Sequence, residues 1–183
     1  TKGMGWDENR EDYVMDFIDI RRAYFHAKAK RDVYVKLPNE DWEEGMCGKL
    51  VMSLYGTRDA AQNWETEYCD FMASIGFESG KASPFTFLHT DRDIRAVVHG
   101  DDFTILGTDG DLNWLRTKMA QKFELKLRGR LGPGIKDLKH IRLLNRIISW
   151  TSEGIECESD QRHGEIIIRG MGFDERTKPV STP

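Results

Sequence analysis

The sequence predicts an α+β fold, in which helices pack on one face of a mainly antiparallel sheet. Short segments rich in β-branched and aromatic residues, such as residues 13–19, are bounded by polar or glycine-containing turns, as antiparallel strands are. Two longer segments, residues 59–75 and 111–123, carry apolar residues at intervals of three and four, which is the period of a helix. Hydrophobic residues make up 39% of the chain and 17 glycines add to them, as in a globular protein with a core.

The strand predictions follow the chain from its first apolar segment, which ends at Asp19. A short helical turn is expected at residues 23–29, followed by two short strands that we expect to pair. Two hairpins are predicted in the middle of the chain, the second with its turn at Gly100-Asp101-Asp102. The predicted strands cover residues 13–19, 33–37, 47–54, 85–89, 94–99, 103–106, 138–150 and 155–158.

Three helices are predicted. The first ends at Gly76, and Asp59 with Gln62 has the spacing of a capping box at its start. The second covers residues 111–123, and a third is expected to run from a cap at Asp160 to residue 171. The stripe that the first helix turns to the core consists of Trp64, Tyr68, Phe71, Met72 and Ile75.

The length of 183 residues suits one domain with a core. We expect a lead-in over residues 1–12, one folded domain over residues 13–172 and a flexible tail over residues 173–183. No apolar run approaches the ~18 to 20 residues of a membrane span, and no signal peptide is visible. An intracellular location, cytoplasmic or nuclear, is therefore predicted, with no membrane partner and no secretion. The cysteines have no paired spacing and are predicted to be reduced core residues: Cys47, Cys69 and Cys157.

Charge is distributed unevenly along the chain. The formal charge is −4, from 27 basic and 31 acidic residues, which argues against binding nucleic acid with the whole surface. Residues 116–146 nevertheless contain ten basic and two acidic residues, and residues 21–36 contain six and one. Residues 7–19 contain six acids and one arginine. Each basic stretch alone could be a solvated face. Together around an acidic cluster, they suggest a polyanion held near bound metal.

Three aspartates are candidate metal ligands. Asp19 ends an apolar strand, and Asp101 and Asp102 lie at a hairpin tip. Strand ends and turns meet at one edge of a sheet if the strands are neighbours. Carboxylate oxygens suit Mg²⁺, and two such ions support phosphoryl transfer. The alternative is a purely structural turn, because Gly-Asp-Asp is also good turn chemistry.

Several motifs occur in a fixed order. Residues 19–25 have an Asp followed five residues later by an aromatic residue, as in the first palm motif of reverse transcriptases, and residues 99–102 resemble the hairpin motif that ends in Asp-Asp. Over roughly residues 13–172 the chain resembles the reverse transcriptase of copia-type long-terminal-repeat retrotransposons. The other matching positions are Val33-Tyr34-Val35, Pro38, Lys49-Leu50, Ser53-Leu54-Tyr55-Gly56, Trp64, Gly76-Phe77, Ala82, Pro84, Phe87, Gly107, residues 123–126 and Gly154-Ile155.

The resemblance implies a palm-like polymerase sheet with part of the fingers, and RNA- or DNA-templated DNA synthesis from deoxynucleotides. Asp19, Asp101 and Asp102 would bind two Mg²⁺ or Mn²⁺ ions. Tyr24 would exclude a 2′ hydroxyl, although it could also be simply a core aromatic. Arg58 would contact phosphate. The template-primer backbone would be held through charge by Lys126, Arg128 and Arg130.

The chain also differs from the family pattern. Asp59-Ala60-Ala61 stands where Gln-Ala-Pro is usual, and Gly100 replaces a residue whose side chain supports the hairpin. We also expect upstream fingers strands, an RNase H and an integrase from such an element, and this chain contains none of them. Two alternatives therefore stay open. One is an inactive relic that keeps the fold and at most binds nucleic acid, and the other is an RNA-copying polymerase with a palm-like sheet.

Overall fold

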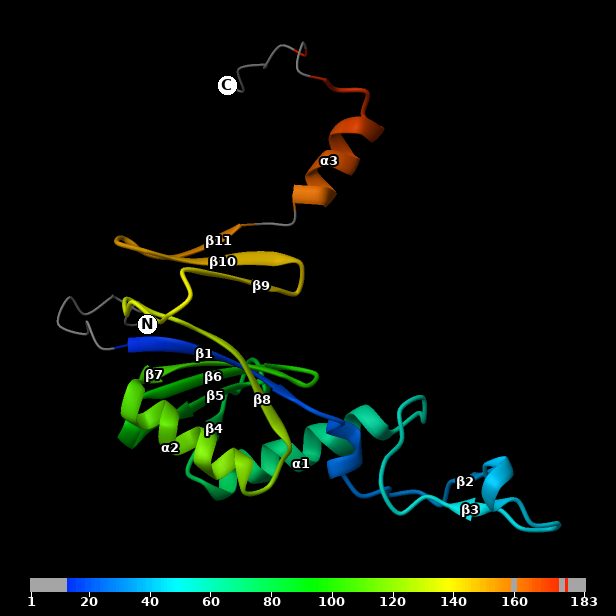
Figure 1. The fold of residues 1–183 in the computed structure, drawn as a ribbon. Helices are drawn as coiled ribbons and strands as arrows, with labels where there is room; N and C mark the ends of the chain where they lie inside the picture. The colour runs from blue at the N-terminus through cyan, green and yellow to red at the C-terminus, as the bar shows by residue number, and fades with distance from the viewer. Residues whose placement is uncertain (1–12, 159–160, 175–176, 178–183) are drawn as a thin grey trace. The chain divides into compact units, whose positions relative to one another are not determined.

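The computed structural model describes residues 13–158, 161–174 and 177 (Figure 1). By its internal contacts the chain divides into two compact units, Thr1–Arg130 and Leu131–Pro183. The limits predicted for a single domain, residues 13–172, stay a prediction. In the part of the chain that is described, no helix has the length and apolar character needed to cross a membrane.

The first unit is built on a six-stranded sheet with the strand order β4-β5-β6-β7-β1-β8. The pairs β4·β5, β5·β6, β6·β7 and β1·β7 are all antiparallel, as predicted. The first strand of the chain thus lies inside the sheet, between β7 and β8. The strand bounds are β1 Tyr13–Ile20, β4 Glu78–Ser79, β5 Thr86–His89, β6 Ile94–His99, β7 Asp102–Thr108 and β8 Leu125–Leu131.

Helices α1 (Ala60–Ser74) and α2 (Asp109–Ala120) cover one face of this sheet (Figure 1). The α+β architecture with helices on one face is therefore confirmed. The period of the first helix was also predicted correctly, because its apolar stripe is buried against the sheet. The principal buried residues of this core are Ile18, Ile20, Trp64, Tyr68, Phe71, Met72, Phe103, Ile105, Leu112, Leu115 and Met119.

The helix starts differ from the predictions. Asp59 makes no side-chain cap to α1, so the predicted capping box is wrong. Its carboxylate is bound instead by Arg31 at 2.8 Å and by Asn63 at 3.2 Å. Helix α2 starts earlier than predicted because the Thr108 hydroxyl accepts a hydrogen bond from the Asp111 N–H and caps it.

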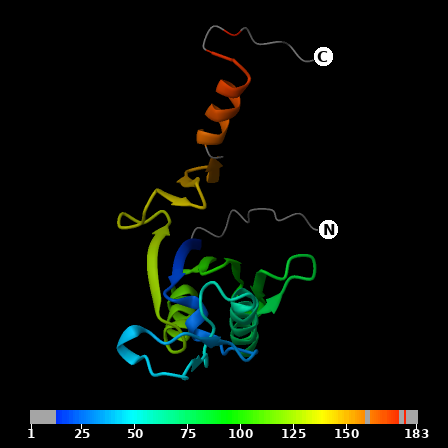
Figure 2. The same cartoon turned by 90° about the vertical axis from the view of Figure 1, so that its right-hand side faces the viewer.

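Between β1 and α1 the chain forms only short elements. These are the 3₁₀ turns η1 (Ala23–His26) and η2 (Asn39–Asp41), and the two-stranded ribbon of β2 (Tyr34–Val35) and β3 (Gly48–Lys49). The ribbon confirms the predicted pairing, and Figures 1 and 2 show it standing beyond the end of α1. Its strands are shorter than predicted, and most of their neighbours are exposed.

The second unit contains a three-stranded sheet and a helix. The strands are β9 (His140–Leu143), β10 (Arg146–Thr151) and β11 (Gly154–Glu158), and the helix is α3 (Gln161–Gly170). The prediction of one strand over residues 138–150 is wrong. Leu144 and Asn145 have φ values of 47° and 61°, so they form a tight turn that folds the segment into a hairpin.

The cysteines were placed correctly only in part. All three are free, as expected of reduced residues. Cys47 and Cys157 are exposed, however, and Cys69 is half-buried, so the prediction that they belong to the core is wrong. The predicted cap Asp160 and most of the predicted tail lie outside the described residues.

Candidate active site

Asp19 and Asp102 are direct partners across the β1·β7 pair. Directly opposed residues of antiparallel strands point to the same face, with Cβ atoms about 4.5 to 5.5 Å apart. Asp101 is the next residue in the turn, and its carbonyl accepts a hydrogen bond from the Ile20 N–H at 3.0 Å. Asp19 and Asp102, which are 83 positions apart in the sequence, are therefore neighbours at one end of this strand pair.

The two opposed carboxylates lie on the face of the sheet away from α1 and α2. Side chains alternate between faces along a strand, and Ile18 and Ile20 on either side of Asp19 belong to the helix-covered core. The same holds on β7, where Phe103 follows Asp102 into that core. Asp19 and Asp102 are half-buried, whereas Asp101 is exposed.

The hairpin turn next to Asp102 is held by a hydrogen bond from helix α1. Gly100 has φ +65°, a left-handed conformation that glycine adopts without strain. Its carbonyl accepts a hydrogen bond from the buried Trp64 indole at 2.8 Å. With His99 paired to Asp102, the loop contains only two residues. Glycine at position 100 therefore fits the conformation of this turn, and the hydrogen bond from Trp64 of α1 holds the turn in position.

Two carboxylates are brought together by register, and a third lies in the adjoining turn. Carboxylate oxygens are the ligands that a hard divalent cation prefers. The side chains of Asp19 and Asp102 also lie on the same face of the sheet, where they could bind one cation together. Among the described residues, no group of three or more His, Cys, Asp or Glu side chains is arranged to hold a metal ion.

Asp102 is paired with a basic residue of the edge strand β8. Arg128 Nη1 lies 2.8 Å from Asp102 Oδ1, and the two side chains are 41% and 18% exposed. Lys126, two residues earlier, is exposed and lies on the same strand. One basic side chain of β8, that of Arg128, therefore contacts the acidic pair directly.

Arg130 lies in an internal ion network. Its Nε and Nη2 donate to the two oxygens of Asp16 at 2.6 and 3.1 Å, and it also pairs with Asp109. Arg116 of α2 approaches the same Asp16 carboxylate at 3.5 Å. The guanidinium of Arg130 lowers the pKa of Asp109. The contacts of Arg130 thus stabilise the fold, and none of them favours the predicted role in binding nucleic acid.

An aromatic group lies near Asp101. Tyr24 stacks on Tyr55 with ring centroids 4.2 Å apart, and Phe25 meets Tyr55 edge-on at 5.7 Å. Tyr24 packs against the core, a position that is compatible with both predicted roles, exclusion of a 2′ hydroxyl and a core aromatic. Tyr55 is 48% exposed. Burial, together with the charge of Asp101, raises the pKa of Tyr55. Tyr55 belongs to a matching motif in the sequence, but no individual role was predicted for it.

Arg58 and Asp59, which precede α1, differ in whether their side chains have an ionic partner. Arg58 is exposed and has no ion pair among the residues that the structure describes. Asp59, in contrast, accepts a hydrogen bond from the Arg31 guanidinium, which is the main reason that the pKa of Asp59 is lowered to about 2. Asp59 therefore carries a charge that Arg31 balances, so it adds little repulsion to a phosphate approaching this loop.

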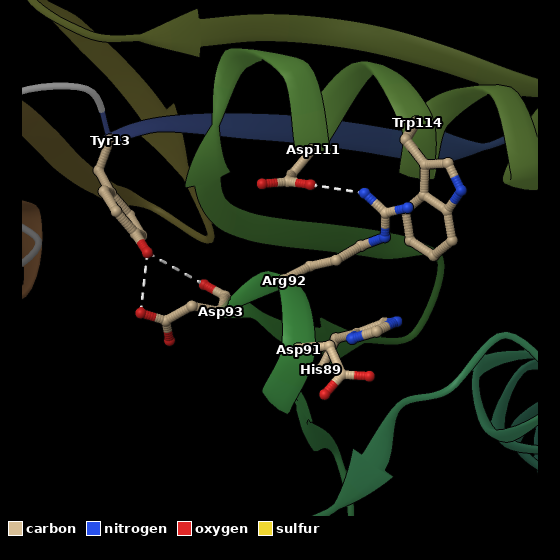
Figure 3. A pocket seen from close by; sticks show the side chains of 7 residues that line it. All are labelled: Tyr13, His89, Asp91, Arg92, Asp93, Asp111 and Trp114. Carbon is tan, nitrogen blue, oxygen red and sulfur yellow. Dashed lines mark hydrogen bonds and ion pairs between the residues drawn. The ribbon is translucent and has the colours of Figure 1, made fainter.

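A surface hollow of about 640 Å³ lies at the other end of β1. Figure 3 shows its lining, in which the Tyr13 hydroxyl donates to Asp93 and Arg92 pairs with Asp111. Arg92 also covers the Trp114 ring at 4.1 Å. Six residues of extended strand, about 20 Å, separate Tyr13 from Asp19. Since several of its charged groups already bind one another, the hollow does not displace the acidic pair as the candidate site.

The sequence is similar to those of known proteins. Residues 8–138 match the family model described as reverse transcriptase (RNA-dependent DNA polymerase). The chain is 26% identical over 182 residues to a retrovirus-related Pol polyprotein from the transposon TNT 1-94 of Nicotiana tabacum, covering 94% of this chain and 13% of that protein. It is 28% identical over 117 residues to the corresponding polyprotein from transposon RE1 of Arabidopsis thaliana, covering 60% of this chain and 8% of that protein.

The matched region contains β1, β7 and the opposed acids. The chain spans only a small part of the polyproteins that it matches. The family model, however, covers well over half of this chain. The chain therefore belongs to the reverse transcriptase (RNA-dependent DNA polymerase) family, in the group found in the Pol polyproteins of copia-type retrotransposons.

Proposed function

We propose that this chain forms the palm and part of the fingers of a reverse transcriptase and carries its nucleotidyl-transfer site. The observation that carries the proposal is the register that sets Asp19 opposite Asp102, on the face of the sheet away from α1 and α2. In the proposed reaction a primer 3′ hydroxyl attacks the α-phosphate of a deoxynucleotide, and pyrophosphate leaves. The partners are a template-primer, deoxynucleotides and the other domains of the Pol polyprotein.

The acidic side chains would hold the cations of this reaction. Asp19 and Asp102, with Asp101 beside them, are the residues that would bind two Mg²⁺ or Mn²⁺ ions. Bound there, such ions lower the charge on the attacking and leaving oxygens. Wherever no positive charge balances them, the aspartates repel one another, which favours binding of a cation.

The remaining side chains would position the substrates. Tyr24, supported by Tyr55, would lie under the incoming sugar and exclude a 2′ hydroxyl. Arg58 is exposed in the loop before α1, where it could bind phosphate. Lys126 and Arg128 would attract the backbone of the duplex by charge, independently of base sequence.

A second candidate function is nucleic-acid binding by an inactive relic. Two observations favour it. Arg128 forms an ion pair with Asp102, and within the described part of the chain no group of three or more His, Cys, Asp or Glu side chains is arranged to hold a metal ion. The two candidates differ in whether the acids support catalysis.

Primer extension with Mg²⁺ or Mn²⁺ tests the proposal. The chain is given a labelled primer-template with deoxynucleotides or ribonucleotides, and Asp19→Asn and Asp102→Asn serve as matched variants that keep the side-chain shape. We expect incorporation of deoxynucleotides and its loss in both variants. Template binding without any incorporation would support the relic, and preferred use of ribonucleotides would support an RNA-copying polymerase.

A further inference from the structure

Arg128 reaches its partner across an intervening strand. It lies on β8, Asp102 lies on β7, and β1 with Asp19 runs between them. Two strand spacings amount to about 9.5 Å, a distance that an extended arginine and an aspartate can bridge together. The guanidinium thus meets the carboxylate on the face of the sheet that carries the candidate site.

The pairing leaves the two opposed acids in different states. Asp102 is balanced by Arg128 at 2.8 Å, whereas the Asp19 carboxylate has no ion pair or hydrogen bond among the described residues. Like charges opposed across a strand pair destabilise it, and Arg128 relieves this repulsion. The same contact places a guanidinium on an oxygen that a divalent cation would need.

The Arg128 pair is of a kind that a phosphate can replace. At 41% exposure the arginine is open to solvent, and ion pairs at the surface contribute little net stability. A guanidinium binds phosphate with the same two-pronged geometry as carboxylate. Lys126 on the same strand adds a second positive charge that would hold a nucleic-acid backbone near Arg128.

We propose that Arg128 is an exchangeable counter-ion that couples nucleic-acid binding to cation binding at Asp102. In the free protein it holds Asp102, and on arrival of a duplex it transfers to a backbone phosphate and leaves the carboxylate to the cation. Arg128 is a positioning residue in this scheme, which rests on the proposed function. Since coupling between two ligands is reciprocal, the cation also strengthens duplex binding by the same factor.

The test measures Mn²⁺ binding by the full chain, followed by electron paramagnetic resonance, without and with a duplex whose primer ends in a dideoxynucleotide. In the wild type we expect the duplex to tighten Mn²⁺ binding. In Arg128→Gln we expect binding without the duplex to be tighter than in the wild type by about threefold, and to change little when the duplex is added. A salt concentration near 0.15 M limits long-range effects of the lost charge, because the screening length there is about 8 Å.

Lys122→Gln is the matched control. Lys122 pairs with Glu67 at 2.7 Å, and the two side chains are 40% and 30% exposed, so this variant also removes one charge and one surface ion pair. It should leave Mn²⁺ binding without the duplex unchanged. Circular dichroism and urea unfolding would verify that each variant is folded.

The outcomes separate the inference from the function on which it rests. If Asp19→Asn abolishes Mn²⁺ binding but Arg128→Gln binds Mn²⁺ no more tightly than the wild type does, the metal site stands and the exchange is overturned. If Asp19→Asn leaves Mn²⁺ binding unchanged, the proposed metal site itself fails. Absence of Mn²⁺ binding to both the wild type and Arg128→Gln overturns both.

Discussion

The Asp16 carboxylate is fully buried, at 0% exposure, and is bound by two arginines. Such an acid is stabilising only while its partners remain, because a buried charge without a counter-charge is costly. The network connects β1, β8 and α2 through Asp16, Arg130 and Arg116. It therefore fixes the edge strand that brings Arg128 to the acidic pair.

Asp16→Asn tests this role. The variant leaves Arg130 and Arg116 around a neutral side chain, and we expect a loss of about 3 kcal/mol in the free energy of unfolding, measured with urea. Asp109→Asn removes the exposed partner of Arg130 and should cost under about 1 kcal/mol. Equal, small losses in both variants would contradict a stabilising role for the buried pair.

The acids of the candidate site can be predicted from the sequence, but not all of their partners can. Asp19 and Asp102 could be predicted because strand ends and hairpin turns collect at sheet edges, and the register confirms that these two residues meet. The role of Asp16 was missed, although a lone acid between apolar residues of a strand is a recognisable signal. The Arg128 contact could not be predicted, because it depends on which strand lies beyond β1, and pattern alone does not give strand order.

At the scale of elements, the sequence predicts those segments whose period is regular or whose turn contains glycine, and it does not predict a two-residue strand or a turn formed by other residues. Helix α1 and the hairpin of β6 and β7 lie where their patterns place them. The two-residue strand β4 gives no pattern to detect. The segment over residues 138–150 looks like one strand because its turn contains Leu144, a residue unusual at positive φ.

The hairpin turn at Gly100 positions Asp101 and Asp102 of the candidate site. A methyl group there would meet no atom within 4 Å, so the effect of Gly100→Ala comes from its φ of +65° alone. We expect a loss of about 1 kcal/mol in the free energy of unfolding, because alanine is strained in the left-handed region.

Gly110→Ala is the control for this prediction. Gly110 also has free space around it, but it lies in the first turn of α2, where alanine is favoured. Its stability should stay equal to that of the wild type or rise slightly. A Gly100→Ala variant as stable as Gly110→Ala would show that the hairpin does not require the left-handed conformation.

At the scale of the whole molecule, the two units differ in how much they bury. In the first unit, β6 and β7 alternate buried and outward-facing residues over a core shared with both helices. In the second unit, every residue of β9, β10 and β11 is half-buried or exposed. Local opening requires less free energy where fewer apolar contacts must be broken.

Native-state hydrogen exchange should therefore divide the chain between these units. We expect the amides of β10 to exchange at least about tenfold faster than those of β7, corresponding to a difference of about 1.4 kcal/mol in opening free energy. Trp150, whose N–H donates to the Lys139 carbonyl at 2.7 Å, and Ile105 at the buried centre of β7 are suitable reporters. Equal protection of these two amides, with the same dependence on urea, would instead mean that both units open together in one cooperative step.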